Sequence, residues 1–359
     1  MRKNIQTAVI GAGLMGHGIA LTLARAGQYV RISDPVQSAR ETVARRISDS
    51  LKGLGEPEDC IPKILKKIEI CGTISSAVHD AEIVFEAAPE KLELKQSIFA
   101  EVEAHAPDTC ILASNTSVMP ITKIMENLRL KNRALGTHWW NPPHMIPLVE
   151  VVATEWTDAG VTDQMMAVLA DAGKTPVRVK KDVPGFIGNR LQHALWREAI
   201  SLVENDICDA EAVDTVIKSS FGRRLAVLGP LENADLVGTD LTLDIHENVL
   251  FDLERRAAPS PHLADLVKQG RFGMRTGEGF RTWTEEEAPP DGAWAQFPAF
   301  ASANGIDVSK VTVEPVGFPT REPMLAEGKV DAITGFSFSS YLNLVRLGVP
   351  EDDIAVILM

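Results

Sequence analysis

Cysteine is scarce in this chain of 359 residues, which has four: Cys60, Cys71, Cys110 and Cys208, with no C-x-x-C pair among them. That spacing excludes a disulfide framework and a cysteine-based zinc site, so we expect reduced thiols and no bound metal. Positive charge is also scarce, since 36 lysines and arginines stand against 49 acidic residues and the net charge is −13. Without a basic stripe, the chain is not expected to bind nucleic acid or an anionic membrane surface.

Long apolar runs are absent as well. The run that follows Met1 stops at Gly11, and no other run approaches the length of a membrane span. We therefore expect a cytoplasmic protein. The chain is 45% hydrophobic and 24% charged, values that are ordinary for a globular protein. Its length is sufficient for two or three domains with cores of their own.

The stretch from Ile5 to Ala20 carries the pattern G-x-G-x-x-G at Gly11, Gly13 and Gly16. A short apolar run precedes it and a segment rich in helix formers follows, which is the order that a dinucleotide-binding turn requires. Gly11 would permit the tight turn, Gly13 would let the backbone approach a pyrophosphate, and Gly16 would let the helix pack against its strand. The free N–H groups at the helix start would then face the phosphates.

A second strand is predicted over residues 29–33, and it ends in Asp34, 18 residues after Gly16. A carboxylate at this place accepts hydrogen bonds from both ribose hydroxyls and repels a 2′-phosphate, so NAD is favoured over NADP. The alternative is an ordinary glycine-rich surface turn with a solvated aspartate.

Strands and helices alternate over the next 150 residues. A helical region is expected from about residue 38 to 67, and its basic residues either form a solvated face or meet the phosphates of a long substrate. Apolar runs predict further strands at 68–70, 81–85, 110–113, 148–152 and 176–179, with a helix at 161–172. This alternation predicts an α/β, doubly wound Rossmann sheet as an NAD-binding domain over residues 1–183.

The pattern changes at residue 184. Helical spacing of apolar residues from Ile187 onward, and a second helix capped by Asp209, predict an all-helical domain over residues 184–284. Its long apolar first helix needs a partner surface. Residues 285–296 are interpreted as a linker, and residues 297–359 as a short appended α/β fragment.

Oxidation of a secondary alcohol needs a base for the hydroxyl proton. His138 is expected in the loop between two strands of the sheet, and Glu150 lies 12 residues further on, along the next strand. A connection of that length allows the carboxylate to contact the imidazole and fix its tautomer. From these residues alone, His138 is equally well a hydrogen-bonded loop histidine.

Six blocks in order make residues 5 to about 283 strongly similar to the L-3-hydroxyacyl-CoA dehydrogenase family. One block is His138-Trp139-Trp140-Asn141-Pro142 together with Leu148-Val149-Glu150-Val151. The other blocks are Gly11-Ala12-Gly13-Leu14-Met15-Gly16, Glu86-Ala87-Ala88-Pro89-Glu90, Ser114-Asn115-Thr116-Ser117, Asp182-Val183-Pro184-Gly185-Phe186-Ile187-Gly188-Asn189-Arg190 and Gly273-Met274-Arg275-Thr276-Gly277-Glu278-Gly279-Phe280.

The resemblance implies an NAD-dependent oxidoreductase of fatty acid metabolism that converts a 3-hydroxyacyl-CoA to its 3-oxo product and dimerises through the helical domain. It implies that His138 is the acid/base, that Glu150 orients it, and that Ser117 and Asn189 hydrogen-bond the reacting oxygen. Ser117 is alternatively a helix N-cap ahead of Pro120, and Asn189 a residue of the first helical turn. The implied NAD contacts are Gly11, Gly13, Leu14, Met15, Gly16, Asp34, Glu90, Lys95, Asn115 and Asn141.

Two departures from the family bear on the substrate. Trp139-Trp140 and the stretch Pro142–Pro147 differ from the more usual residues, and resemble relatives that act on free hydroxy acids or alcohols, namely gulonate, carnitine and pyridine-carboxylate dehydrogenases. The two indoles beside the base would narrow the pocket or stack on a planar substrate. The alternatives are thus a free hydroxy acid or aromatic alcohol as substrate, or a catalytically silent NAD- or solute-binding protein. Residues 297–359 resemble part of a periplasmic solute-binding protein of the taurine and nitrate type.

Overall fold

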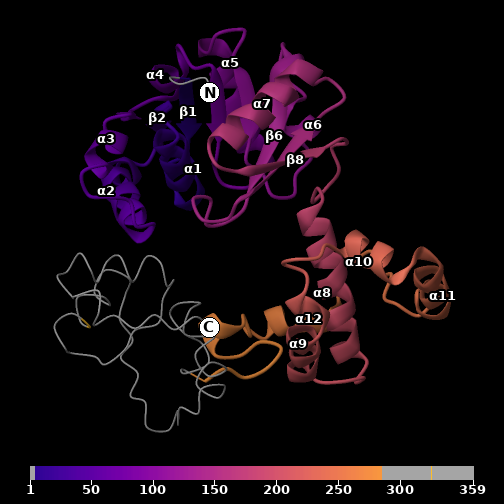
Figure 1. Ribbon diagram of the computed structural model, residues 1–359. Coiled ribbons are helices and arrows are strands. Elements are labelled where there is room, and N and C mark those ends of the chain that lie inside the picture. The colour runs from indigo at the N-terminus through magenta and orange to yellow at the C-terminus, as the bar shows by residue number, and fades with distance from the viewer. Residues whose placement is uncertain (1–4, 285–324, 326–359) are drawn as a thin grey trace. The chain divides into compact units, whose positions relative to one another are not determined.

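The structure is a computed structural model that describes residues 5–284 and residue 325 (Figure 1). The described chain divides into two compact units, the first ending at Arg190 and the second beginning at Leu191. The expected linker and the fragment from residue 297 lie outside the described residues, apart from Leu325. Among the described residues, no helix is long and apolar enough to cross a membrane.

The first unit is built on one sheet of eight strands in the order β3-β2-β1-β4-β5-β6-β7-β8. Strands β1 to β6 pair in parallel, β7 runs antiparallel to β6, and β8 is parallel to β7. The predicted Rossmann sheet is therefore confirmed. Its strands are β1 (Gln6–Ile10), β2 (Tyr29–Ser33), β3 (Ile68–Cys71), β4 (Ile83–Glu86), β5 (Ile111–Ser114), β6 (Ala134–Trp139), β7 (Leu148–Ala153) and β8 (Thr175–Val179).

Helices cover both faces of this sheet. Neighbouring residues of a strand point to opposite faces, so Phe85 of β4 joins a core formed with α1, α2, α3 and α7, whereas Val84 joins a core formed with α4, α5 and α6. The sheet is thus buried on both sides, as the continuous apolar strands predict. The helices are α1 (Leu14–Arg25), α2 (Gln37–Gly53), α3 (Ile61–Leu65), α4 (Ile74–Val78), α5 (Leu92–His105), α6 (Ile121–Met125) and α7 (Ala159–Asp171), with a 3-10 turn η1 (Lys131–Arg133).

The helical region expected over residues 38–67 is two helices in the structure. Helix α2 ends at Gly53 and α3 begins at Ile61, so the intervening residues form a turn. Gly55 adopts a φ of +71°, which a helix does not allow, and Pro57 follows it.

The second unit contributes the helical elements that the sequence predicts. Asp209 caps its helix as expected, since its Oδ1 accepts a hydrogen bond from the backbone N–H of Ala212 at 2.7 Å. The elements are α8 (Gly188–Glu204), which starts in the last residues of the first unit, then α9 (Ala210–Ser219), η2 (Phe221–Arg223), α10 (Pro230–Val237), α11 (Thr239–Val249), α12 (Pro261–Lys268) and η3 (Met274–Thr276).

Candidate active site

The glycine loop joins β1 to α1, and its three glycines are there for different reasons. A Cβ on Gly11 would lie 2.6 Å from the carbonyl oxygen of Ala87, and one on Gly16 would lie 1.7 Å from the carbonyl oxygen of Gly11. Packing alone therefore requires glycine at both positions. A Cβ on Gly13 would meet no described atom within 4 Å. The space at Gly13, at the N-cap of α1, fits the close approach of a pyrophosphate to free N–H groups.

Asp34 follows the end of β2 and contacts this loop directly. Its Oδ2 accepts a hydrogen bond from the Ala12 N–H at 2.7 Å, and its Oδ1 accepts one from the Val36 N–H at 2.8 Å. A carboxylate oxygen accepts more than one hydrogen bond, so ribose hydroxyls fit here in addition. The position agrees with the predicted adenosine-ribose contact, which remains a prediction.

Arg46 of α2 supports the same loop, a contact that the sequence does not reveal. Its guanidinium donates to the carbonyl oxygens of Ala12 at 2.5 Å and Gly13 at 3.3 Å. Arg46 is therefore not a free solvated charge, which is one of the two alternatives considered for the basic residues of this region. It satisfies loop carbonyls instead, and so leaves the N–H side of the loop for a ligand.

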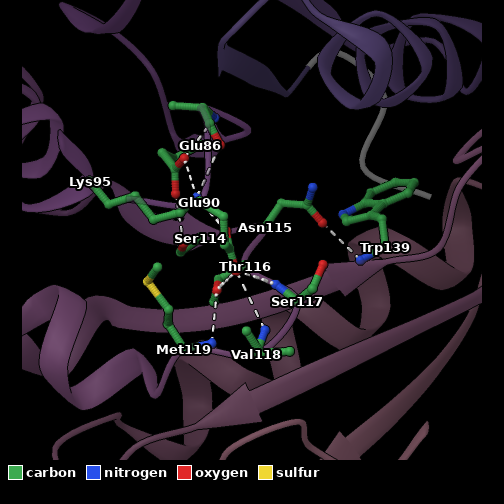
Figure 2. A network of polar contacts seen from close by, with 11 residues as sticks. Glu86, Glu90, Lys95, Ser114, Asn115, Thr116, Ser117, Val118, Met119 and Trp139 are labelled. Carbon is green, nitrogen blue, oxygen red and sulfur yellow. Dashed lines mark hydrogen bonds and ion pairs between the residues drawn. The ribbon is translucent and has the colours of Figure 1, made fainter. Parts of the chain in front are cut away.

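A buried charge network lies where β4 and β5 end (Figure 2). The side chains of Glu86 and Lys95 are both 0% exposed, and Lys95 Nζ lies 2.7 Å from Glu86 Oε1. Ser114 Oγ donates to the other oxygen of Glu86 at 2.6 Å. Lys95 Nζ also lies 3.3 Å from Glu90 Oε2 and donates to the Ala88 carbonyl oxygen at 3.2 Å. These contacts occupy the lysine donors, so the geometry supports a role for Lys95 in holding Glu90 rather than the cofactor.

Glu90 in turn fixes the loop after β5. Its Oε1 accepts hydrogen bonds from the hydroxyl of Thr116 and from the backbone N–H of Ser117, the latter at 2.8 Å (Figure 2). Burial alone would raise the pKa of Glu90, but the Thr116 hydrogen bond and the charge of Lys95 outweigh burial and hold that pKa below its usual range. Glu90 therefore remains an anion that anchors the backbone beside the candidate reacting site.

His138 and Glu150 form the centre of the site. The structure places His138 in β6, not in a loop as expected, because the strand continues to Trp139. In the antiparallel pairing of β6 with β7, His138 is the register partner of Glu150, and His138 Nδ1 lies 2.7 Å from Glu150 Oε2. Both residues are buried, at 4% and 1% exposure. Among the described residues, none hydrogen-bonds Nε2 of His138, so that nitrogen remains for a proton.

Glu150 is held as a carboxylate. Burial would raise its pKa, but hydrogen bonds from His138 and from the backbone N–H groups of Gly188 and Ile187 lower it below its usual range. The two N–H groups donate to Glu150 Oε1 at 2.8 Å (Ile187) and 3.1 Å (Gly188). Each carboxylate oxygen therefore has its own partners, and the charge that would stabilise an imidazolium is fixed in place.

Ser117 and Asn189 come together, since Asn189 Nδ2 donates to the Ser117 carbonyl oxygen at 2.7 Å. Ser117 does not cap a helix, because the N-cap of α6 is Pro120. Asn189 does lie in the first turn of α8. Asn115 is buried, and its Oδ1 accepts from the backbone N–H of Trp139 at 2.9 Å. Asn141 is exposed two residues after β6, and no hydrogen bond joins it to a described residue.

The two tryptophans after His138 have different surroundings. The ring of Trp140 lies 5.1 Å from the His138 ring, measured between centroids, and packs where a Cβ of Gly188 would be. Trp139 is 2% exposed and packs edge-on against Phe85 in the core. The expectation of two indoles beside the base is therefore wrong. Successive side chains of a strand point to opposite faces, so Trp139 cannot share the face of its neighbours.

The loop after Trp140 is held by Lys174, a second contact that the sequence does not reveal. Lys174 Nζ donates to the carbonyl oxygens of Pro143 at 2.5 Å and Ile146 at 2.9 Å. Burial lowers the pKa of Lys174 to about 8. The same loop places His144 beside His17 of α1, with ring centroids 5.8 Å apart, and so joins the loop to the helix that starts at the glycine motif.

Comparison with known proteins agrees with this geometry. The model for the NAD-binding domain of 3-hydroxyacyl-CoA dehydrogenases matches residues 6–183, and the model for the C-terminal domain of the same family matches residues 185–283. The chain is 35% identical over 293 residues to the 5-formyl-3-hydroxy-2-methylpyridine 4-carboxylate 5-dehydrogenase of Mesorhizobium japonicum, covering 80% of this chain and 93% of the relative. It is 36% identical over 286 residues to a probable 3-hydroxybutyryl-CoA dehydrogenase of Bacillus subtilis, covering 78% and 98%.

A solved structure gives the same result. The crystal structure of a 5-formyl-3-hydroxy-2-methylpyridine 4-carboxylic acid 5-dehydrogenase, described as an NAD⁺-dependent dismutase, superposes with a TM-score of 0.72 at 32% identity. It covers 86% of this chain and 98% of that one. Neither family model extends past residue 283, so the resemblance of residues 297–359 to a solute-binding protein gains no support from them.

Proposed function

Since the chain belongs to the 3-hydroxyacyl-CoA dehydrogenase family and contains its NAD-binding domain, we propose that it oxidises the 3-hydroxy group of a 3-hydroxyacyl-CoA to the 3-oxo product. As a member of this family it is an oxidoreductase with NAD as cofactor. The observation that carries the proposed reaction is the buried His138–Glu150 pair at 2.7 Å, which is joined through Gly188 to the neighbouring Asn189 and, by the Asn189 hydrogen bond, to Ser117. A base, its orienting carboxylate and two polar groups for the oxygen are what the reaction needs.

In this proposal His138 Nε2 takes the hydroxyl proton, and Glu150 stabilises the imidazolium that results. The Ser117 hydroxyl and the Asn189 amide hold the oxygen while the carbonyl forms. Gly13 and Asp34 would hold NAD, which would supply the hydride acceptor. Glu90, Lys95, Asn115 and Asn141 act on the nicotinamide side, Lys95 through Glu90. For reduction the proton returns from His138 to the oxygen.

A second candidate substrate is a free hydroxy acid or aromatic alcohol. Two observations favour it: the similarity to the pyridine-carboxylate dehydrogenase, and the Trp140 ring beside His138. An indole offers a flat apolar surface on which a planar substrate stacks. A CoA ester, by contrast, needs no planar group at its 3-position.

A panel of substrates distinguishes these candidates. The full chain is incubated with NAD and, in turn, (S)-3-hydroxybutyryl-CoA, free 3-hydroxybutyrate, carnitine, gulonate and 5-formyl-3-hydroxy-2-methylpyridine 4-carboxylate, and NADH is followed at its absorbance band. NADH from the CoA ester, and little from the free acids, is the expected result. If NADH forms with the pyridine compound alone, the second candidate substrate is supported and the CoA ester is excluded. Absence of NADH with every member would support a catalytically silent NAD-binding protein.

The helical unit is proposed to form a homodimer. No residue of α8 to α11 is buried within the described chain, and large apolar side chains there are widely exposed, for example Leu231 at 80% and Leu236 at 73%. Apolar surface of this extent is typical of an interface. Sedimentation of the full chain is expected to give twice the 39.0 kDa monomer mass. The double variant Leu231→Glu, Leu236→Glu should lower the measured mass toward that of the monomer, whereas Leu94→Glu on α5 should leave it unchanged. A monomeric mass for the unmodified chain would contradict the proposal.

Three further expectations remain proposals. The domain boundary at residues 183 and 184 agrees with where the two family models meet. A cytoplasmic location is testable by cell fractionation, in which recovery outside the cytoplasmic fraction would exclude it. The solute-binding resemblance of residues 297–359 falls outside the described residues and would be tested by deleting them, which should leave NADH formation unchanged.

A further inference from the structure

We propose that Phe186 is a positioning residue for the His138–Glu150 pair, and that the segment Asp182–Asn189, which enters α8, holds the pair in its reactive geometry. This inference rests on the proposed function, because it assigns a role to residues around the same base. Apart from Asn189, the residues of this segment are proposed to act through the imidazole and the carboxylate and not by touching the substrate.

The backbone of the segment is the first observation. Gly185 has a φ of +75° and Phe186 a φ of +50°. A positive φ is unfavourable for a residue with a Cβ, and such conformations persist when the surroundings fix them, often at functional sites. Here the surrounding packing fixes the conformation, since Phe186 is 1% exposed and its ring centroid lies 5.6 Å from that of His138. The left-handed turn thus places a large aromatic ring against the base.

The same turn aims two donors at the carboxylate. The N–H groups of Ile187 and Gly188 both donate to Glu150 Oε1, and Gly188 is the first residue of the 17-residue helix α8. Free N–H groups at the start of a helix stabilise an anion. Glu150 therefore receives hydrogen bonds from β6 at one oxygen and from the start of α8 at the other. Among the described residues, His138 is the charged or titratable group that acts on Glu150.

Both ends of the segment are anchored in the first unit. Asp182 Oδ2 accepts hydrogen bonds from the backbone N–H and the hydroxyl of Thr122, at 2.7 Å and 2.8 Å. At the other end, Asn189 donates to the Ser117 carbonyl. Between these anchors the segment has little freedom, so its inner residues can hold the imidazole and carboxylate at fixed separation. A fixed separation matters because misplacement of a catalytic group by about 1 Å lowers rates by about 10²-fold.

The first test compares Phe186→Leu with Phe99→Leu. Both phenylalanines are buried in the same core, but Phe99 lies in α5, away from the pair. With (S)-3-hydroxybutyryl-CoA and NAD, Phe186→Leu should lower kcat by about tenfold and leave KM for NAD unchanged, because the imidazole loses the ring that fixes its position while the contacts proposed for the cofactor are kept. Phe99→Leu should change stability alone. Equal kcat for the two variants would overturn the proposal.

A second variant avoids any loss of core packing. Replacing Ile187 by its α-hydroxy acid analogue turns the peptide N–H into an ester oxygen and removes one donor to Glu150 while keeping every side chain. Proton NMR of the histidine-labelled full chain then reports the Nδ1 proton of His138 without any substrate. Its downfield position should shift in the ester variant; an unchanged resonance contradicts the proposal. Failure of the proposed function is seen separately, as absence of NADH from the unmodified chain.

Discussion

Replacing His138 by glutamine lowers kcat by about two to four orders of magnitude in our account, the usual contribution of a general acid/base. Glutamine retains a polar group that reaches Glu150 but cannot take a proton at neutral pH. The carboxylate would still be held by Ile187 and Gly188. The loss should therefore appear in kcat, with KM for NAD nearly unchanged, because the glycine loop and Asp34, which are proposed to hold the adenosine side of the cofactor, follow other strands.

Steady-state rates with saturating NAD measure this effect. His105→Gln serves as the matched control, since His105 is exposed in the last turn of α5 and contacts the Glu101 carbonyl only through its own helix. Full activity is expected for the control. Turnover of His138→Gln within a factor of a few of the unmodified chain would remove the histidine from the mechanism, whatever the substrate.

Replacing Lys95 by methionine is expected to destabilise the first unit by about 3–5 kcal/mol, the cost of leaving one charge of a buried pair without its partner. Glu86 and Lys95 are both 0% exposed, and Glu86 has no access to water that would replace the lysine. Glu90 would also lose a contact, and with it the loop at Thr116 and Ser117 would loosen. Activity should therefore fall together with stability.

Urea denaturation measures the change, and a double variant identifies its cause. Lys95→Met combined with Glu86→Gln removes both charges, so it should recover much of the loss. Lys63→Met breaks the exposed i,i+4 pair with Asp59 and should change stability little. A Lys95→Met transition that coincides with that of Lys63→Met would show that the buried network does not hold this part of the fold.

The sheet and its helices can be predicted from the sequence because short-range patterns of residues determine them. The glycine motif, the acid at Asp34 and the alternation of apolar strands with helices specify a parallel sheet, and the comparison of residues 6–183 with the family agrees. The 12-residue spacing of His138 and Glu150 allows their contact, and the antiparallel pairing of β6 with β7 brings the two residues into register.

What the sequence does not predict depends on which way side chains point and on distant contacts. No turn residue marks the end of β6, so the sequence does not show that this strand extends through His138 to Trp139, and strand alternation then places the Trp139 ring on the opposite face from His138. The left-handed turn at Phe186 has no local signal, since a phenylalanine rarely adopts a positive φ without tertiary packing. Arg46 and Lys174 reach carbonyl oxygens 28 or more residues away, which no local pattern encodes.

The central claim is that His138 removes the proton while the carbon hydrogen passes to NAD. Its most direct test uses (S)-3-hydroxybutyryl-CoA carrying deuterium at C3, with mass spectrometry of the NADH that forms. The account predicts deuterium in the NADH from the unmodified chain, and formation of that product at a rate about two to four orders of magnitude lower from His138→Gln. NADH without deuterium, or labelled NADH formed equally fast by the variant, would contradict it.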